Sequence, residues 1–340
     1  MPMTDSLSPP LLQINENGLF CQVGNFYIDP WRSVDFAVIT HGHSDHAKAH
    51  SRAYLCAKPS ASILRIRLGK HINLQTLPYG ESITHNGVKI SLHPAGHILG
   101  SAQVRVEYKG EVWVVTGDYK REPDLTCDPF EPVPCHTLVT ESTFGLPIFN
   151  WPNPEEVHKD INAWWDYNAI QGKICILFAY SLGKAQRLLS QLDANIGPIH
   201  ANPAISAINK AYEAEGVYLP NLDNSSGDAL PGSLLIVPPS YLNSRFTESH
   251  YINTTAHASG WMALKGMQIQ NRSDRGFVLS DHADWKGLLQ TVEDCNPEKV
   301  LVTHGFVEPL VKYLNETGVQ AYALNTPYQA ESPILREQNE

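Results

Sequence analysis

The sequence predicts a mixed α/β fold, in which a strand-rich part is joined to a smaller part of alternating strands and helices. The first ~145 residues contain short apolar runs and alternating patterns that end at turn residues, which is typical of strands. From about Pro147 onwards, buried-strand patterns alternate with helical periodicity. This alternation favours a parallel sheet covered by helices.

Four segments of the first part have the patterns of strands or hairpins. An apolar run that leads directly into a histidine-rich motif predicts a buried strand. Asn-Gly and Lys-Gly pairs between alternating segments predict hairpin turns. These segments are residues 36–40, 82–93 with a turn at Asn86–Gly87, 101–118 with a turn at Lys109–Gly110, and 136–142.

The second part alternates between helix and strand, and the strand pattern of the first part then returns. The two final strand-like segments each end in a histidine, as the first segment does. Helices are expected at residues 152–170, 181–192 and 203–215, and strands at 173–180, 196–201, 233–239, 276–285 and 299–306.

The composition limits the class of protein. A chain of 340 residues with 42% hydrophobic and 18% charged residues can form two domains, or one domain with a large insertion, and is not disordered over most of its length. We expect no membrane segment, because no apolar run approaches the ~20 residues required. The start MPMTDSLSPP has no signal-peptide pattern, and the six cysteines form no C-x-x-C pair. A cytoplasmic protein with reduced cysteines is therefore expected.

The motif HGHSDH carries the strongest functional information. It supplies His41, His43, Asp45 and His46, and residues two apart in an extended chain point the same way. Imidazole together with carboxylate suits zinc and similar ions. With 15 histidines in the chain, about 0.001 matches to this spacing are expected by chance. The motif therefore predicts a metal site.

One loop cannot enclose two ions, so further ligands have to come from other strand ends. His97, Asp118 and His304 each follow an expected strand. Any one of them alone would more often be structural. Together with the HGHSDH motif, they complete a set for two metal ions, with Zn²⁺ favoured and Mn²⁺ also open.

In this order, the motifs resemble those of the metallo-β-lactamase superfamily. Asp29 in FYIDPW matches the carboxylate that steadies the metal loop. The motifs GDYKR, ESTFG, FAYSLGKAQRLL and LSDHADW are similar to those of the β-CASP nuclease branch. Within that branch, GLFCQVGNFYIDPW and ESTFGLPIFNWP are most similar to the bacterial ligase-associated DNA exonucleases.

The resemblance implies an αββα sandwich, formed by residues 1–146 and 273–340, with a β-CASP domain inserted at residues 147–272. It implies that Asp118 bridges the two metal ions. It also implies that Glu141 and His282 form the acid–histidine pair beside the leaving group. The implied ligands are His41, His43 and His97 for one ion, and Asp45, His46 and His304 for the other.

The expected activity is two-metal hydrolysis of phosphodiester bonds. His282, oriented by Glu141, is suited to donate a proton to the leaving oxygen, although each could instead be an ordinary structural residue at a strand end. Glu141 and His304 are more similar to the RNA-processing members of the branch. The similarity of the whole chain favours a DNA exonuclease in repair or end processing, with an RNA-processing ribonuclease as the alternative.

Basic residues gather directly after the metal motif. Residues 47–80 contain six Lys and Arg but no Asp or Glu, in a chain with a net charge of −10. Arg52, Arg65 and Arg67 are therefore expected either to contact phosphates or to form a solvated helix face. Ser181 and Lys184 open a helix after a strand, which suits an anion but also fits an ordinary turn. His257 is left without a role.

Two other functional classes remain open. A small-molecule metallohydrolase of the same superfamily would lack the inserted domain and the Glu141–His282 pair. An inactive scaffold would have lost ligand residues, whereas all seven positions are filled here. The expected partners are therefore nucleic acid, with DNA favoured, and a DNA ligase or helicase repair system, as the name of the similar group implies.

Overall fold

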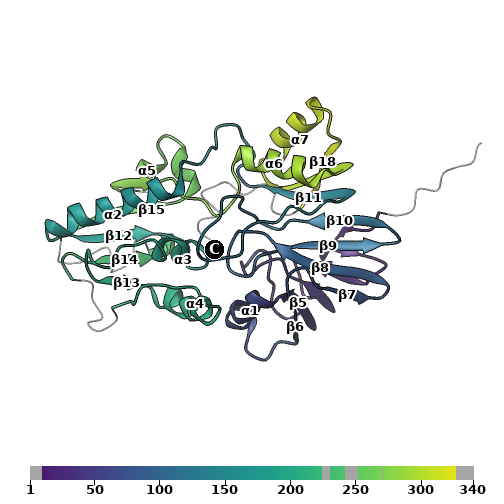
Figure 1. Cartoon of the computed structure of the whole chain (residues 1–340), viewed down its shortest axis with the longest axis horizontal. Coiled ribbons are helices and arrows are strands. Elements are labelled where there is room, and N and C mark those ends of the chain that lie inside the picture. The colour runs from purple at the N-terminus through teal and green to yellow at the C-terminus, as the bar shows by residue number, and fades with distance from the viewer. Residues whose placement is uncertain (1–9, 224–229, 242–251, 271, 327–340) are drawn as a thin grey trace, which may run out of the picture.

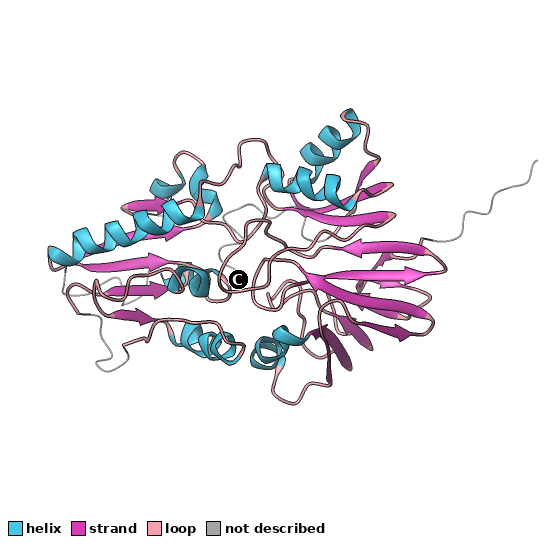
Figure 2. Ribbon diagram, in the orientation of Figure 1, coloured by secondary structure: helices cyan, strands magenta, loops and turns pink. Residues whose placement is uncertain are grey.

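The computed structural model describes residues 10–223, 230–241, 252–270 and 272–326. Three sheets and their helices form two parts that lie side by side (Figure 1). The part on the right of Figure 1 contains two sheets and the part on the left contains the third, and Figure 2 separates helices from strands in the same view. The mixed α/β class predicted from the sequence is confirmed.

The first sheet has the strand order β1-β2-β3-β4-β5-β6 and the second has the order β18-β17-β11-β10-β9-β8-β7. The strands of the first are β1 (Gln13–Asn15), β2 (Gly18–Cys21), β3 (Phe26–Ile28), β4 (Phe36–Val38), β5 (Ala53–Ala57) and β6 (Leu74–Leu77). Those of the second are β7 (Ser82–His85), β8 (Val88–Pro94), β9 (Ala102–Tyr108), β10 (Glu111–Val115), β11 (Thr137–Ser142), β17 (Lys299–Gly305) and β18 (Ala321–Ala323).

These two sheets pack face to face between outer helices. Apolar side chains from both sheets, including Leu55, Val104 and Trp113, form the shared core. The outer face of the first sheet packs against α1 (Ala61–Leu68), which follows a short 3₁₀ helix, η1 (Lys58–Ser60). Helices α6 (Trp285–Cys295) and α7 (Val307–Glu316) cover the outer face of the second. The layer order is therefore helix, sheet, sheet, helix.

The third sheet is entirely parallel and has the order β13-β14-β12-β15-β16. Its strands are β12 (Ile174–Phe178), β13 (Ile199–Ala201), β14 (Leu234–Val237), β15 (Asn253–Ala258) and β16 (Arg275–Phe277). Helices α2 (Pro154–Ile170), α3 (Lys184–Leu189) and α4 (Pro203–Ala214) bury their apolar sides against one face. Short helices η2 (Pro239–Tyr241), η3 (Gly260–Ala263) and α5 (Met267–Gln270) complete this part.

Most of the expected elements are present, with two differences. Both hairpins form as predicted, because Asn86–Gly87 and Lys109–Gly110 take the positive φ angles that tight hairpin turns require. Helix α3 spans only six residues, shorter than the expected 181–192. Strand β16 pairs with β15, so the third sheet continues to Phe277, beyond the expected boundary at residue 272.

The two parts share apolar contacts. Ile63 of α1 and Ile98 and Leu99 of the segment after β8 belong to the same buried core as residues of the third sheet and its helices. The backbone N–H of Leu99 donates to the hydroxyl of Tyr212 in α4 at 3.2 Å. The strand ends of the first part therefore lie directly against the second part.

Candidate functional site

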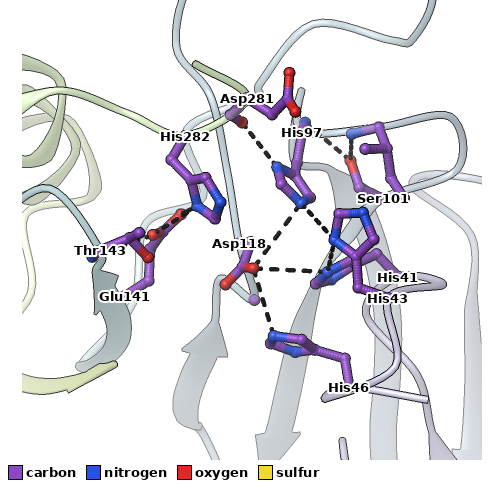
Figure 3. Close-up of polar contacts among 12 residues, drawn as sticks. His41, His43, His46, His97, Ser101, Asp118, Glu141, Thr143, Asp281 and His282 are labelled. Atoms are coloured by element: carbon purple, nitrogen blue, oxygen red, sulfur yellow. Dashed lines mark hydrogen bonds and ion pairs between the residues drawn. The ribbon is translucent and has the colours of Figure 1, made fainter. Parts of the chain in front are cut away.

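The expected metal ligands come together where several strands end. Strands β8, β10, β11 and β17 run in the same direction, so their carboxyl ends lie at one edge of the second sheet. The segment after β4 reaches the same place from the first sheet, where Figure 3 shows the side chains. His97 follows β8, Asp118 follows β10, Glu141 lies in β11, and His304 lies near the end of β17.

One group of candidate ligands contains His41, His43, His97 and Asp118. One ligand atom from each lies within 4.8 Å of the others, and all four residues are buried. Nδ1 of His43 lies 3.1 Å from Nε2 of both His41 and His97. Asp118 Oδ2 lies 3.6 Å from His41 Nε2 and 3.9 Å from His97 Nε2.

A second group contains His46, His304 and the same Asp118. Asp118 Oδ2 lies 3.4 Å from His46 Nε2, and Figure 3 shows this carboxylate between the imidazoles of both groups. Asp45 Oδ2 lies 3.5 Å from His46 Nε2, beside this second group. Asp45 and His304 also line one hollow together with His46.

Four of the imidazoles have a hydrogen-bond partner on the ring nitrogen that faces away from the group. His43 Nε2 donates to the Leu182 carbonyl at 3.2 Å, and His97 Nδ1 donates to the Asp281 carbonyl at 2.7 Å. A carbonyl can only accept, so these contacts fix the tautomer and leave the inner nitrogens without a proton. The outer nitrogens of His41 and His46 also have partners, Thr40 and Asp29 respectively.

Asp29 orients two of these imidazoles, those of His41 and His46. Its carboxylate accepts from the Thr40 backbone N–H at 2.8 Å and from the Thr40 hydroxyl at 2.5 Å. That hydroxyl can then only accept from His41 Nδ1, which lies 3.1 Å away. The other contact of Asp29 is with His46 Nδ1 at 2.8 Å. One carboxylate thus orients a histidine of each group.

The arrangement suits divalent ions. Inner nitrogens 3.1 Å apart, both without a proton, repel each other unless a cation lies among them. In tetrahedral geometry, a Zn–N distance of about 2.0–2.1 Å places ligand nitrogens about 3.3 Å apart. Ligating histidines usually donate their other N–H to a carboxylate or carbonyl, as these do.

The electrostatics agree with unprotonated inner nitrogens at His41 and His97, whereas the carboxylates around His46 favour its protonated ring. Burial, together with the neighbouring imidazoles, lowers the pKa of His41 and His97 well below the usual value and keeps these rings neutral. Burial alone would lower the pKa of His46, but Asp118, Asp45 and Asp29 raise it well above. Burial likewise opposes ionisation of Asp118, yet His46 lowers its pKa well below the usual value.

Glu141 and His282 form a pair beside the first group. His282 Nδ1 lies 3.0 and 2.9 Å from the two carboxylate oxygens of Glu141, as Figure 3 shows. The backbone N–H of Tyr119 also donates to Glu141 at 2.8 Å. The His282 ring lies beside that of His97 in a tilted arrangement, with ring centroids 4.7 Å apart. The His282 side chain therefore lies next to the candidate metal group, with a ligand atom within 4.8 Å of Asp118.

The expected substrate contacts are distributed unevenly. Lys184 lines a hollow beside the candidate ligands, together with Tyr180 and Trp261, but its ammonium is buried and pairs with Asp281 at 3.2 Å. Ser181 lies in the turn before α3. Because α3 has only six residues, it offers no extended helix terminus for an anion.

The arginines of residues 47–80 do not form one surface. Arg65 and Arg67 are exposed on α1, which lies beside α4 where the two parts meet (Figure 1). Arg52 precedes β5, which runs parallel to β4, so Arg52 lies at the opposite edge of the sheet from HGHSDH. His257, which has no expected role, is buried and stacks on Phe178 with centroids 4.6 Å apart.

Sequence reasoning missed a buried ion cluster behind His97. It consists of Asp124, Lys184, Arg187 and Asp281. Burial alone would raise the pKa of Asp281, but Lys184 and Arg187 lower it below the usual range. The motif LSDHADW, in which Asp281 precedes His282, could have drawn attention to this aspartate.

Comparisons with known proteins give relatives that match most of this chain. Profiles of known protein families give no match. The chain is 32% identical to a probable DNA ligase of Opitutus terrae over 94% of this chain and 31% of that protein. It is 30% identical to Endoribonuclease YSH1 of Eremothecium gossypii, covering 82% of this chain and 43% of that protein.

Two further similarities are more distant. Cleavage and polyadenylation specificity factor subunit 3 of Dictyostelium discoideum is 26% identical over 54% of this chain and 28% of its own length. A solved structure of a protein of unknown function from Enterococcus faecalis shares the fold, with a TM-score of 0.58 and 12% identity, over 87% of this chain and 80% of that one. The chain spans less than half the length of these curated relatives. Together, the sequence similarities support the assignment of the chain to the metallo-β-lactamase/β-CASP nuclease family.

Proposed function

We propose that the protein is a metal-dependent hydrolase that cleaves phosphodiester bonds in nucleic acid and uses two divalent ions, with Zn²⁺ favoured. The observation that carries this proposal is the tautomer pattern, in which outer contacts orient the imidazoles of His41, His43 and His97 and turn their unprotonated nitrogens inward. A structural cluster of histidines would not require neighbouring bare nitrogens at 3.1 Å.

In this proposal, His41, His43 and His97 hold one ion, Asp45, His46 and His304 hold the other, and Asp118 bridges both. When bound, such ions activate water and stabilise negative charge on a scissile phosphate. The position of Asp118 in both groups supports the bridging role. Asp45 lies beside the second group, 3.5 Å from His46.

Glu141 and His282 are proposed to handle the proton of the leaving group. Glu141 accepts from His282 Nδ1, which stabilises the protonated ring, and Nε2–H is the proposed proton donor. The backbone N–H of Tyr119 holds Glu141 in place at 2.8 Å. His282 thus has the geometry of a general acid oriented by a carboxylate.

The domain division is part of the proposal. Residues 1–146 and 273–340 would form the metallo-β-lactamase αββα sandwich, and residues 147–272 the inserted β-CASP domain. The layer order of the first part and the parallel third sheet support this division. The pairing of β16 moves its second boundary to about Phe277.

DNA is the proposed substrate, cleaved from an end during repair in the cytoplasm, with a DNA ligase or helicase system as partner. The similarity that spans 94% of the chain, to a probable DNA ligase, favours DNA. The relative named an endoribonuclease, similar over 82% of the chain, favours RNA as the second candidate. Among the described residues, no helix is long and apolar enough to cross a membrane.

The test compares four substrates under one set of conditions. Purified protein with Zn²⁺ or Mn²⁺ is incubated with end-labelled single- and double-stranded DNA and RNA. Mononucleotide release from DNA alone would support the DNA exonuclease. Internal cuts in RNA would support the ribonuclease. No cleavage of any of the four, while both ions are bound, would contradict the proposed activity.

A further inference from the structure

We infer that Arg187 is a positioning residue, which fixes the loops of His97 and His282 from the opposite part of the molecule and so holds His97 in place as a metal ligand. The inference rests on the proposed metal centre. Arg187 lies in α3, whereas His97 follows β8, and Ser280 and Asp281 lie between β16 and α6. Three segments far apart in the sequence therefore meet at one guanidinium.

The contacts of Arg187 use all three nitrogens of the guanidinium. Nη2 donates to the carbonyl of His97 at 3.1 Å, and Nη1 donates to the carbonyl of Ser280 at 2.7 Å. Nη1 also lies 2.8 Å from the Asp281 carboxylate, and Nε pairs with Asp124. The side chain is only 3% exposed, so these contacts replace its hydration.

The same cluster fixes the ring of His97. The Asp281 carbonyl accepts from His97 Nδ1 at 2.7 Å, while the Asp281 carboxylate is held by Arg187 and, at 3.2 Å, by Lys184. Figure 3 shows Asp281 directly behind His97, on the side away from Asp118. The position of the Asp281 backbone therefore determines where His97 Nε2 points.

A lysine cannot make the same set of contacts. The planar fork of arginine donates in fixed directions to several acceptors at once, whereas an ammonium is a single charged point. The cluster contains two cations, Lys184 and Arg187, and two anions, Asp124 and Asp281. Removal of Arg187 alone would leave a buried negative charge, so a charge-balanced variant is needed.

The inference predicts an unequal effect on the two metal groups. Arg187 and Asp281 contact His97, which belongs to the first group. Within the part of the chain that the structure describes, the hydrogen bonds and ion pairs of the Arg187 side chain go to His97, Ser280, Asp281 and Asp124, and none goes to the second group, His46 with Asp118 and His304. Loss of the guanidinium should therefore weaken one ion and spare the other.

The main variant combines Arg187→Met with Asp124→Asn, which leaves Asp281 paired with Lys184. A second variant, Arg187→Lys, keeps the charge but loses the fork. The matched control combines Arg121→Met with Asp294→Asn, because this pair, at 2.6 Å, is another Arg–Asp contact and joins the segment after β10 to α6. Ile208→Ala, in the core of the second part, controls for a loss of stability alone.

Four quantities are measured on the full chain. They are the metal content, the Zn²⁺ affinity by chelator competition, the Co²⁺ absorption spectrum and the Tm. Both Arg187 variants should bind one ion about 10–100-fold more weakly, with a changed Co²⁺ spectrum, and bind the other as the parent does. The Arg121 and Ile208 variants should keep both affinities even where Tm falls.

Two results would overturn the inference in different ways. If both Arg187 variants bind two ions as the parent does, Arg187 stabilises the fold only. If Arg187→Lys restores the parent affinity, charge alone suffices and the positioning role is wrong.

A parent protein that binds no metal would contradict the proposed metal centre and this inference together. Altered metal binding in a parent that cleaves no nucleic acid would contradict only the proposed activity.

Discussion

Asp118 is the residue that both groups of candidate ligands share. One oxygen lies 3.4 to 3.9 Å from three imidazole nitrogens. It is also 93% buried, where an ionised carboxylate is unfavourable unless cations surround it. The unfavourable burial of this charge therefore occurs at the carboxylate that both groups of candidate ligands share, where two bound ions would stabilise it.

Replacement of Asp118 by Ala should remove both ions and abolish cleavage, because the variant lacks the ligand common to both groups. Elemental analysis after dialysis tests this, with the parent expected to keep close to two ions per chain. Asp128→Ala is a suitable control, because Asp128 belongs to neither group. If the Asp118 variant retains a full ion and its activity, the bridging assignment is wrong.

His282→Ala and Glu141→Gln should each slow cleavage by about 10²–10⁴-fold while both ions remain bound, because general acid catalysis typically contributes that factor. Single-turnover rates and metal content, measured on the same preparations, check the prediction. A substrate with a good leaving group should be cleaved by the His282 variant at nearly the parent rate. Equal losses on both substrates would exclude a proton-donating role.

His158 should make the metal-free protein less stable in mild acid. Burial, with a smaller effect of Arg187, lowers the pKa of His158 from 6.5 to about 4. Protonation is therefore easier in the unfolded chain, so this contribution to stability is present above about pH 6.5 and is lost as the pH falls towards 4. Between pH 7.5 and 5, the loss should be about 2 kcal/mol.

Urea unfolding at both pH values tests the role of His158. It is measured on the parent, on His158→Gln and on His71→Gln, a control at an exposed histidine. His257, whose pKa burial also lowers to about 4, contributes equally in all three proteins, so the difference between variants isolates His158. The pH dependence should be smaller in the His158 variant only. An unchanged pH dependence would show that His158 is not the titrating group.

At the scale of residues, the sequence predicted which side chains meet and, through the resemblance, the orienting carboxylate Asp29, but not the other groups that orient them. The spacing of HGHSDH and the positions of His97, Asp118 and His304 at strand ends were enough to bring the candidate ligands together. Their outer partners include the carbonyls of Leu182 and Asp281, which lie 139 and 184 residues away in the chain. A backbone carbonyl carries no residue identity, so no sequence pattern could reveal these contacts.

At the scale of elements, the periodicity of the sequence predicted most helices and strands. Tertiary contacts determined where α3 begins and how far β16 extends. The pattern of residues 181–192 is helical, yet Gly183 takes a positive φ and α3 begins only at Lys184. A Cβ on Gly183 would lie 2.2 Å from Ile98 Cγ2, so contact with the other part determines this start. Strand β16 likewise has only three residues, and its sheet is set by β15 rather than by its own sequence.

Helix α1 offers a sharper test of the basic surface than the whole of residues 47–80 does. If Arg65 and Arg67 contact phosphates, Arg65→Gln with Arg67→Gln should weaken binding of single-stranded DNA. The slope of log affinity against log salt should flatten by about 0.7 for each contact that is lost. Stability should change by less than about 0.5 kcal/mol, because both side chains are exposed.

Arg52→Gln is the matched control, since Arg52 is also exposed but lies at the opposite edge of its sheet from the metal motif. Its salt slope should equal that of the parent. Equal slopes for all three proteins would make the arginines of α1 an ordinary solvated helix face. A flattened slope for Arg52→Gln alone would place the nucleic acid on the other side of the first sheet.

At the scale of the whole molecule, the candidate site depends on both parts. All seven candidate ligands come from the first part, but Leu182 and Arg187 of the second part contact His43 and His97. The parts also share a continuous apolar core through Ile63, Ile98 and Leu99. The inserted part therefore supports the geometry of the ligands as well as forming one wall of the hollow at Lys184.

Removal of metal should consequently destabilise the whole chain. An ion that binds only the folded protein adds about 4 kcal/mol when its free concentration is 1,000 times its dissociation constant. Because the ligands follow strands of both sheets and contact the second part, Tm should fall by at least several degrees after chelation, in one transition. Zn²⁺ should restore it in the parent but not in Asp118→Ala. If chelation leaves Tm and the metal content of the parent unchanged, the histidine cluster is a structural feature without bound ions.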